Sequence, residues 1–155
     1  MPVDGWCAIL LLPALLAIAL WDARTRRIPN ACIAALLATD WLLFAAENPN
    51  PMLLARTGFY SALAGGAVLA AGVGFDYAMM RFGGVRAIGG GDMKLVAAFA
   101  AMPACASLVL VLFCACVLAL LFAFVTGKGR KDTIPFGPFL AAGFILGALV
   151  ESLVV

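Results

Sequence analysis

The chain has 155 residues, of which 66% are hydrophobic and 12% charged, with a net charge of +2 and a mean hydropathy of +1.13. These values lie far outside the range of a soluble domain of this size, so an all-α polytopic membrane protein is expected. The chain has no histidine, and its five cysteines form no C-x-x-C pair. Zinc sites of the usual spacing and Ser-His or Cys-His catalysis are therefore excluded, and no metal, cofactor or nucleic-acid partner is expected.

Six hydrophobic stretches can be drawn, and most are near the about 20 residues that a membrane-spanning helix needs. They cover residues 5–21, 31–46, 57–79, 93–103, 104–125 and 136–155. The first has no basic segment before it and carries Asp4 instead, so it is expected to be a retained helix rather than a signal peptide. No linker, repeat or low-complexity segment interrupts the series. A single integral-membrane domain over residues 1–155 is therefore predicted.

Basic residues gather in alternate connections between these stretches. The connections 22–30, 80–94 and 126–135 hold nine of the ten Lys and Arg residues, and only Arg56 falls elsewhere. Because Lys and Arg concentrate in cytoplasmic loops, these three connections are predicted to be cytoplasmic. About six transmembrane helices with both termini outside follow. The short fourth stretch must then cross, since otherwise the basic cluster of residues 126–135 would lie outside.

Two aspartates lie at the cytoplasmic ends of these stretches, Asp22 after the first and Asp92 before the fourth. Two carboxyls held close together cannot both ionise easily, so one keeps its proton as an acid while the other acts as a base. Each aspartate alone has a simpler explanation. Asp22 could be a solvated charge beside arginines, and Asp92 could be the N-cap of a helix that follows a flexible loop. Their common position at one membrane face favours an aspartic protease.

Glycine and proline mark two segments. Residues 89–91 are three glycines that are expected to lie outside a helix, because a glycine in a helix costs about 1 kcal/mol relative to alanine. Outside a helix, glycines let backbones approach closely or take positive φ. Residues 134–141 read IPFGPFLA and open the last stretch. Prolines are common at a helix start, so this segment alone also has a purely structural explanation.

Taken together, the three motifs resemble those of the type IV prepilin peptidase family, the G-x-G-D class of membrane aspartic proteases. They read DARTRRIPN from residue 22, GGGDMKL from residue 89 and IPFGPFLA from residue 134. The likeness extends to about residue 143 and is strongest to the short members that serve tight-adherence (Flp-type) pili. It implies that Asp22 and Asp92 are catalytic. The residues implied to bind substrate or shape the site are Gly89, Gly91, Lys94, Pro135, Gly137 and Pro138.

The resemblance also implies a substrate and a place. A prepilin or pseudopilin leader would be removed at the cytoplasmic face of the bacterial inner membrane, just before the hydrophobic helix of the substrate. Residues 89–91 are expected to let an extended piece of substrate backbone lie against them. The chain lacks the insert with paired C-x-x-C motifs of larger members, so no methyltransferase activity is expected. The basic loops suit contact with anionic lipid headgroups.

Other acids and other functions compete with this interpretation. Asp76 is expected to pair with Arg81 or Arg86 as a structural anchor, and Asp40, beside Trp41, to reach the outer interface. A small proton-coupled transporter would use intramembrane acids near the midplane. A non-catalytic assembly subunit of a pilus or secretion system would explain the hydrophobicity, but not the paired acids with their glycines.

Overall fold

The computed structural model describes residues 5–84, 89–103, 107–127 and 135–154. All regular structure in these residues is helical. The helices are α1 (Gly5–Thr25), α2 (Asn30–Glu47), α3 (Pro51–Gly83), α4 (Gly90–Ala101), α5 (Leu108–Thr126) and α6 (Gly137–Val154). Each predicted hydrophobic stretch corresponds to one helix, which confirms the all-α prediction.

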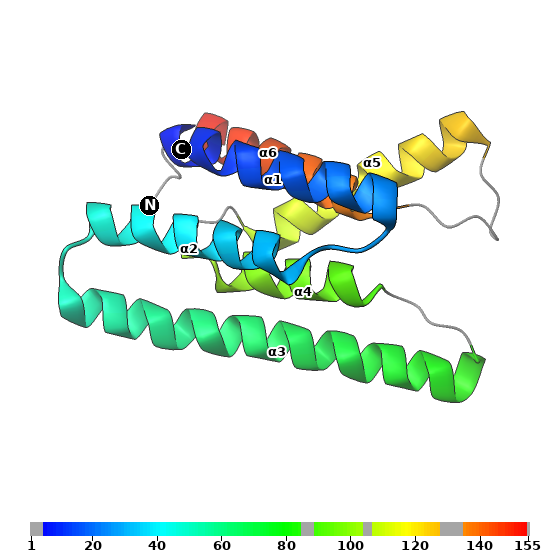
Figure 1. The fold of residues 1–155 in the computed structure, drawn as a ribbon, viewed down its shortest axis with the longest axis horizontal. Coiled ribbons are helices and arrows are strands. Elements are labelled where there is room, and N and C mark those ends of the chain that lie inside the picture. Colours follow the sequence, from blue (N-terminus) through cyan, green and yellow to red (C-terminus); the bar gives the residue numbers. More distant parts are fainter. Residues whose placement is uncertain (1–4, 85–88, 104–106, 128–134, 155) are drawn as a thin grey trace.

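The helices run back and forth between two ends of the molecule (Figure 1). The last residues of α1, α3 and α5 and the first residues of α2, α4 and α6 lie at one end, which we call the site end. The three connections rich in Lys and Arg join helices at this end. In the packing, α1 contacts α2 and α6, α3 contacts α4, and α5 contacts α6. The short α4 runs back along α3, as the predicted crossing of the fourth stretch requires.

Several helices have the length and surface of membrane spans. By length and composition, α2, α3 and α5 can cross a membrane, and Gly137–Glu151 forms a shorter apolar helix. Large apolar side chains such as Phe59, Phe113 and Phe124 are exposed on α3 and α5. So many exposed large apolar side chains are unfavourable in water and suit a lipid environment. The protein is therefore a polytopic membrane protein.

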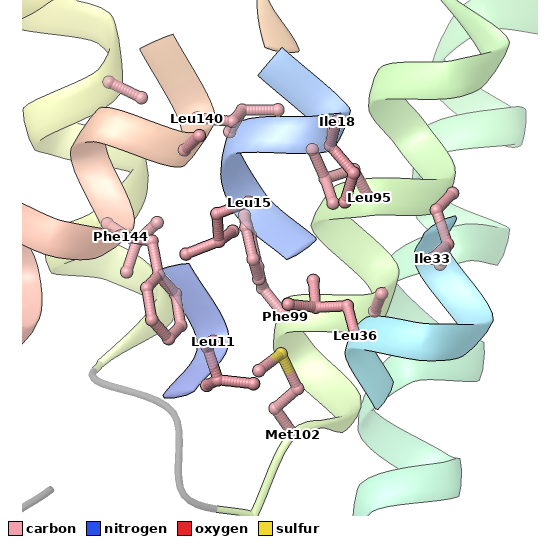
Figure 2. Close-up of a cluster of buried hydrophobic side chains, with 14 of the residues drawn as sticks. Leu11, Leu15, Ile18, Ile33, Leu36, Leu95, Phe99, Met102, Leu140 and Phe144 are labelled. Atoms are coloured by element: carbon pink, nitrogen blue, oxygen red, sulfur yellow. The ribbon is translucent and has the colours of Figure 1, made fainter. Parts of the chain in front are cut away.

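The core is built from one face each of α1, α2, α4 and α6 (Figure 2), and α5 adds the fully buried Val111 and Ala115. Its largest side chains are Leu11, Leu15, Ile18, Leu36, Leu95, Phe99, Leu140 and Phe144. Along each helix these residues recur every three or four positions, so they share one face. The rings of Phe99 and Phe144 stack with their centroids 5.2 Å apart, which joins α4 to α6.

The buried faces of three helices continue into residues of the predicted motifs. Asp22 follows the last large apolar residue of the α1 face by four positions, and Asp92 and Gly137 precede the first such residues of α4 and α6 by three. The helical spacing that buries the apolar side chains thus also turns these three residues inward. All three lie at the site end of the core.

Close packing of α3 on α4 depends on two glycines. A Cβ at Gly65 would lie 2.9 Å from the Cβ of Ala101 and 3.0 Å from the carbonyl oxygen of Ala97, and one at Gly72 would lie 3.0 Å from Sδ of Met93. Small residues allow helix backbones to approach closely in membranes. The contact holds α4, and with it the second motif, against the longest helix of the protein.

Candidate active site

Asp22 lies in the last turns of α1 and is only 5% exposed. Its Oδ2 accepts a hydrogen bond from the backbone N–H of Gly137 at 3.0 Å. The chain leaves α1 directly afterwards, because Arg26 adopts a φ of 53° while its N–H donates to the carbonyl of Asp22 at 2.8 Å. Arg24 and Arg27 are exposed. The explanation of Asp22 as a solvated charge among arginines is therefore wrong.

Asp92 is the third residue of α4, and the N-cap position belongs to Gly89, with φ −67° and ψ 136°. The alternative in which Asp92 is the N-cap is therefore wrong. Gly90 and Gly91 lie inside the helix, so the expectation that all three glycines stay outside one is also wrong for these two. Positive φ at glycine occurs elsewhere in the described part of the chain. At Gly89 and Gly91, glycine is favoured by close packing rather than by backbone conformation.

The protein itself fills the space beside two of these glycines. A Cβ at Gly89 would lie 2.9 Å from Oδ2 of Asp92, and one at Gly91 would lie 3.3 Å from both N and Cγ1 of Ile28. Ile28 belongs to the connection between α1 and α2 and is buried. The first turn of α4 thus packs on the residues that follow Asp22. Nothing lies within 4 Å of a Cβ at Gly90. Of the three glycines, Gly90 is therefore the one that has free space beside it.

Lys94 connects the second motif to the end of the first. Its Nζ donates a hydrogen bond to Oδ1 of Asn30 at 3.1 Å on the protein surface. Asn30 is the first residue of α2, so this bond holds the beginnings of α2 and α4 together at the site end. Sequence reasoning selected Lys94 but missed its partner Asn30 and the packing residue Ile28. Both residues lie within the first motif, DARTRRIPN, so the motif itself could have identified them as residues of the site.

The third motif meets the first at the beginning of α6. Pro135 precedes this helix, and Gly137 and Pro138 are its first two residues. Proline is well suited to a helix start because its missing N–H leaves no intrahelical hydrogen bond unmade there. Of these three residues, Gly137 contacts Asp22 directly.

The two carboxyls influence each other electrostatically. Burial, and secondly the negative charge of Asp22, raise the pKa of Asp92 from 3.8 to about 6. Burial acts because a carboxylate removed from water loses solvation of its charged form, and a like charge nearby adds to that cost. Asp92 therefore keeps its proton at a pH where an ordinary aspartate has lost it. Near and below about pH 6, the arrangement therefore provides a protonated acid that is electrostatically coupled to a second carboxyl.

Comparison with known families agrees with this geometry. Residues 9–124 match the profile of the type IV leader peptidase family, and this range includes both aspartates. The chain belongs to the type IV leader peptidase family. The resemblance inferred from the motifs is thereby confirmed at family level, and this leader peptidase is a membrane-embedded peptidase. No curated protein and no solved structure matches significantly.

Two further acids of this leader peptidase are buried in other helices. Asp40 is 0% exposed and continues the buried face of α2. It does not reach the outer interface as expected, because the helical spacing turns it inward. Asp76 is 8% exposed in α3. Of its two expected partners, Arg81 is exposed and Arg86 lies outside the described residues, so the pairing stays a prediction.

Proposed function

We propose that this leader peptidase is an aspartic endopeptidase that removes the leader of prepilin or pseudopilin-like substrates, with Asp22 and Asp92 as its catalytic pair. The observation that carries the proposal is the electrostatic coupling of two acids from separate motifs at one end of the core. A structural pair of aspartates would be destabilising, because burial and like charge both disfavour ionisation. Groups with strongly perturbed pKa values gather at functional sites for this reason.

The environments of the two acids suggest different parts in the reaction. Asp92, with its raised pKa, is the acid that donates a proton to the nitrogen of the scissile amide. Asp22 is the base that takes a proton from a water molecule lying between the two carboxyls. The resulting hydroxide attacks the carbonyl carbon, and the C–N bond breaks as the nitrogen receives its proton. Asp92 ends ionised and Asp22 protonated, and a proton exchange between them restores the starting state.

The substrate and orientation follow from the charge pattern and the motifs. Nine of the ten basic residues belong to connections at the site end, which favours a cytoplasmic active site in a bacterial inner membrane. A leader lying just before a hydrophobic helix would reach the pair from that side. The motif spacing favours the short Flp-type members and a single peptidase domain over residues 1–155. The exposed apolar surface and basic connections suit lipid chains and anionic headgroups.

Cleavage of a leader-bearing pilin in membranes tests the proposal. Asp22→Asn and Asp92→Asn should each reduce processing to background while the protein remains inserted at normal abundance, because each carboxyl carries a separate proton transfer. Processing should also resist serine-directed reagents. Asp76→Asn is the matched control, since Asp76 is a buried aspartate of another helix, and it should process the substrate nearly normally. Normal cleavage by either Asp22→Asn or Asp92→Asn would remove that residue from the catalytic pair.

A further inference from the structure

The contact between α6 and Asp22 has a specific geometry. The backbone N–H of Gly137 donates to Oδ2 of Asp22 at 3.0 Å in a buried position, although 115 residues separate them in the sequence. We propose that the first turn of α6 is the positioning element of the catalytic pair, in which the Gly137 amide holds Asp22 so that Oδ1, rather than Oδ2, takes the proton of the water. This inference rests on the proposed function.

The hydrogen bonds of the α6 first turn explain why Gly137 is available to Asp22. The first N–H groups of a helix have no partner within the helix. Here the carbonyl of Phe136 accepts from Phe139 and Leu140, each at 3.0 Å, and Pro138 has no N–H. The N–H of Gly137 is the one directed at Asp22. The carboxyl of Asp22 thereby satisfies the buried N–H of Gly137. Without a hydrogen-bond partner, this buried donor would cost about 1–3 kcal/mol.

The absence of a side chain at residue 137 is equally specific. A Cβ there would lie 2.7 Å from Oδ2, 2.9 Å from Cγ and 2.9 Å from Cβ of Asp22. Real Cβ atoms do not approach other atoms so closely, and the Cβ of Asp22 cannot rotate away because it is attached to the α1 backbone. Any larger residue must therefore push α6 from α1 or displace the carboxyl. Glycine is required at this position because the backbone itself approaches the acid.

The hydrogen bond from Gly137 determines which oxygen of Asp22 can accept a proton. With Oδ2 engaged by the amide, the carboxyl cannot rotate freely, and Oδ1 is the oxygen that can accept a proton without loss of this bond. A carboxyl held in this way needs little reorganisation when it takes the proton, and small misplacements of such groups can cost about 100-fold in rate. The third motif would thus act on catalysis through Asp22, as a positioning element rather than as a catalytic one.

Solution NMR of the detergent-solubilised protein labelled with 15N-glycine tests the hydrogen bond without reference to activity. The Gly137 signal is assigned by its loss in Gly137→Ala. We expect it to lie downfield in the wild-type protein and to move upfield in Asp22→Asn, where an amide replaces the acceptor, and to move less in Asp92→Asn. The Gly66 signal is the control, because Gly66 is exposed on α3. An unchanged Gly137 signal in Asp22→Asn overturns the inference, whether or not the protein cleaves pilin.

Steady-state kinetics on a pilin substrate test the positioning itself. Gly137→Ala should lower kcat by about 100-fold and change KM less than about twofold, because substrate binding does not depend on the orientation of Asp22. Gly143→Ala is the matched control in the same helix, where a Cβ would lie 2.6 Å from the carbonyl oxygen of Val111. That variant should lose abundance or thermal stability while each molecule keeps its kcat.

The outcomes separate this inference from the proposed function. A wild-type kcat per molecule in Gly137→Ala overturns the positioning by Gly137, even if Asp22→Asn is inactive. Loss of kcat with a preserved KM supports it. If Gly137→Ala does not accumulate, 13C-carbonyl labelling of phenylalanine restricts the assignment to Gly83 and Gly137, the two glycines that directly follow a phenylalanine. The one of these two signals that moves upfield in Asp22→Asn is then Gly137, and no movement of either signal overturns the inference.

Discussion

Asp22 and Asp92 have the same side chain but different surroundings. Asp22 receives a backbone hydrogen bond from another helix, whereas Asp92 lies in the first turn of α4 with a pKa raised by burial and by Asp22. An acid and a base require carboxyls that differ in this way, because two identical environments would give neither a reliable donor nor a reliable acceptor. The difference arises from neighbours that the fold supplies and not from the aspartates themselves.

The raised pKa of Asp92 predicts an inactive variant that is more stable than the wild type. Because the folded-state pKa is about 6 against an ordinary 3.8, the folded protein holds this proton more tightly than the unfolded chain does. Stability is therefore lost as pH rises from about 4 to about 6. Asp92→Asn cannot ionise, so it should gain about 1–2 kcal/mol at pH 7.5, less than the full shift of about 3 kcal/mol because solvent reaches part of the side chain.

Thermal unfolding in detergent between pH 4 and pH 8 measures this difference. The melting temperatures of Asp92→Asn and wild type should converge near pH 4, where both side chains are neutral, and diverge as pH rises. A constant difference across this range would show that ionisation of Asp92 does not oppose folding.

Two adjacent glycines provide a matched test of the space around Asp92. A Cβ at Gly89 would lie 2.9 Å from Oδ2 of Asp92, whereas nothing lies within 4 Å of one at Gly90. Gly89→Ala should therefore displace the carboxyl and lower cleavage per molecule by about 10- to 100-fold, since catalytic geometry tolerates little displacement. Gly90→Ala, inside α4, should keep its activity. Pilin cleavage normalised to protein abundance measures both variants. Equal activities would show that the missing side chain at Gly89 does not determine the position of the Asp92 carboxyl.

At the scale of the helices, hydrophobic stretches are sufficient to predict the number and order of the elements. The hydrophobic stretch that predicts α3 begins at residue 57, six residues after the helix itself begins at Pro51. The missed signal was local, because Oδ1 of Asn50 accepts hydrogen bonds from the N–H groups of Met52 and Leu53, and Pro51 occupies the first turn. Asparagine followed by proline is a recognisable helix start.

Other features could not be predicted because they depend on packing between distant segments. Gly91 lies in a helix beside Ile28, and Gly137 lies against Asp22. Neither contact follows from local sequence, since each requires knowing which helices are neighbours and at what height they meet. The motifs identify the residues of the candidate site, whereas the close approach of backbone to side chain that makes glycine necessary is a property of the fold.

Packing between α3 and α4 gives a prediction at this scale. A Cβ at Gly65 would approach Ala101 Cβ to 2.9 Å and Ala97 O to 3.0 Å, whereas one at Gly66 would meet nothing within 4 Å. Gly65→Ala should therefore separate the helices and lower both thermal stability and cleavage. Gly66→Ala should be neutral or stabilising by up to about 1 kcal/mol, because alanine favours a helix over glycine. Thermal unfolding of the two variants in one detergent measures this, and equal melting temperatures would contradict the close contact.

The whole molecule combines one long helix with one short helix around the candidate site. α3 has 33 residues and α4 has 12, or about 50 Å and 18 Å at 1.5 Å per residue. Gly72 of α3 lies opposite Met93, next to the first turn of α4. From Gly72 to Gly83, α3 therefore extends about 16 Å beyond this contact. The candidate catalytic pair is therefore recessed from the end of α3. A hydrocarbon core of about 30 Å centred on this helix would end about 10 residues from its midpoint, which leaves the level of Gly72 about 7 Å inside that edge.

This arrangement makes the crossing of α4 decisive for the topology. Because α4 is shorter than the hydrocarbon core, its crossing is inferred from its path along α3 (Figure 1) and from the basic residues near the end of α5. If α4 crosses, the ends of α1 and α5 lie on the same side of the membrane, which the charge pattern predicts to be the cytoplasm. If it does not, the end of α5 and the basic residues after it face outward, against the tendency of Lys and Arg to remain inside.

Single cysteines in a cysteine-free variant distinguish these cases. An impermeant maleimide should label Pro49→Cys in intact spheroplasts, since Pro49 lies in the connection between α2 and α3 at the opposite end. Arg27→Cys and Thr126→Cys should react only after the membrane is permeabilised, because the charge pattern predicts that the site end faces the cytoplasm. All three positions are exposed, so a difference in labelling reports sidedness and not burial. Labelling of Thr126→Cys in intact spheroplasts would show that α4 does not cross, and it would place the beginning of α6, with Gly137, on the wrong side of the membrane to reach Asp22.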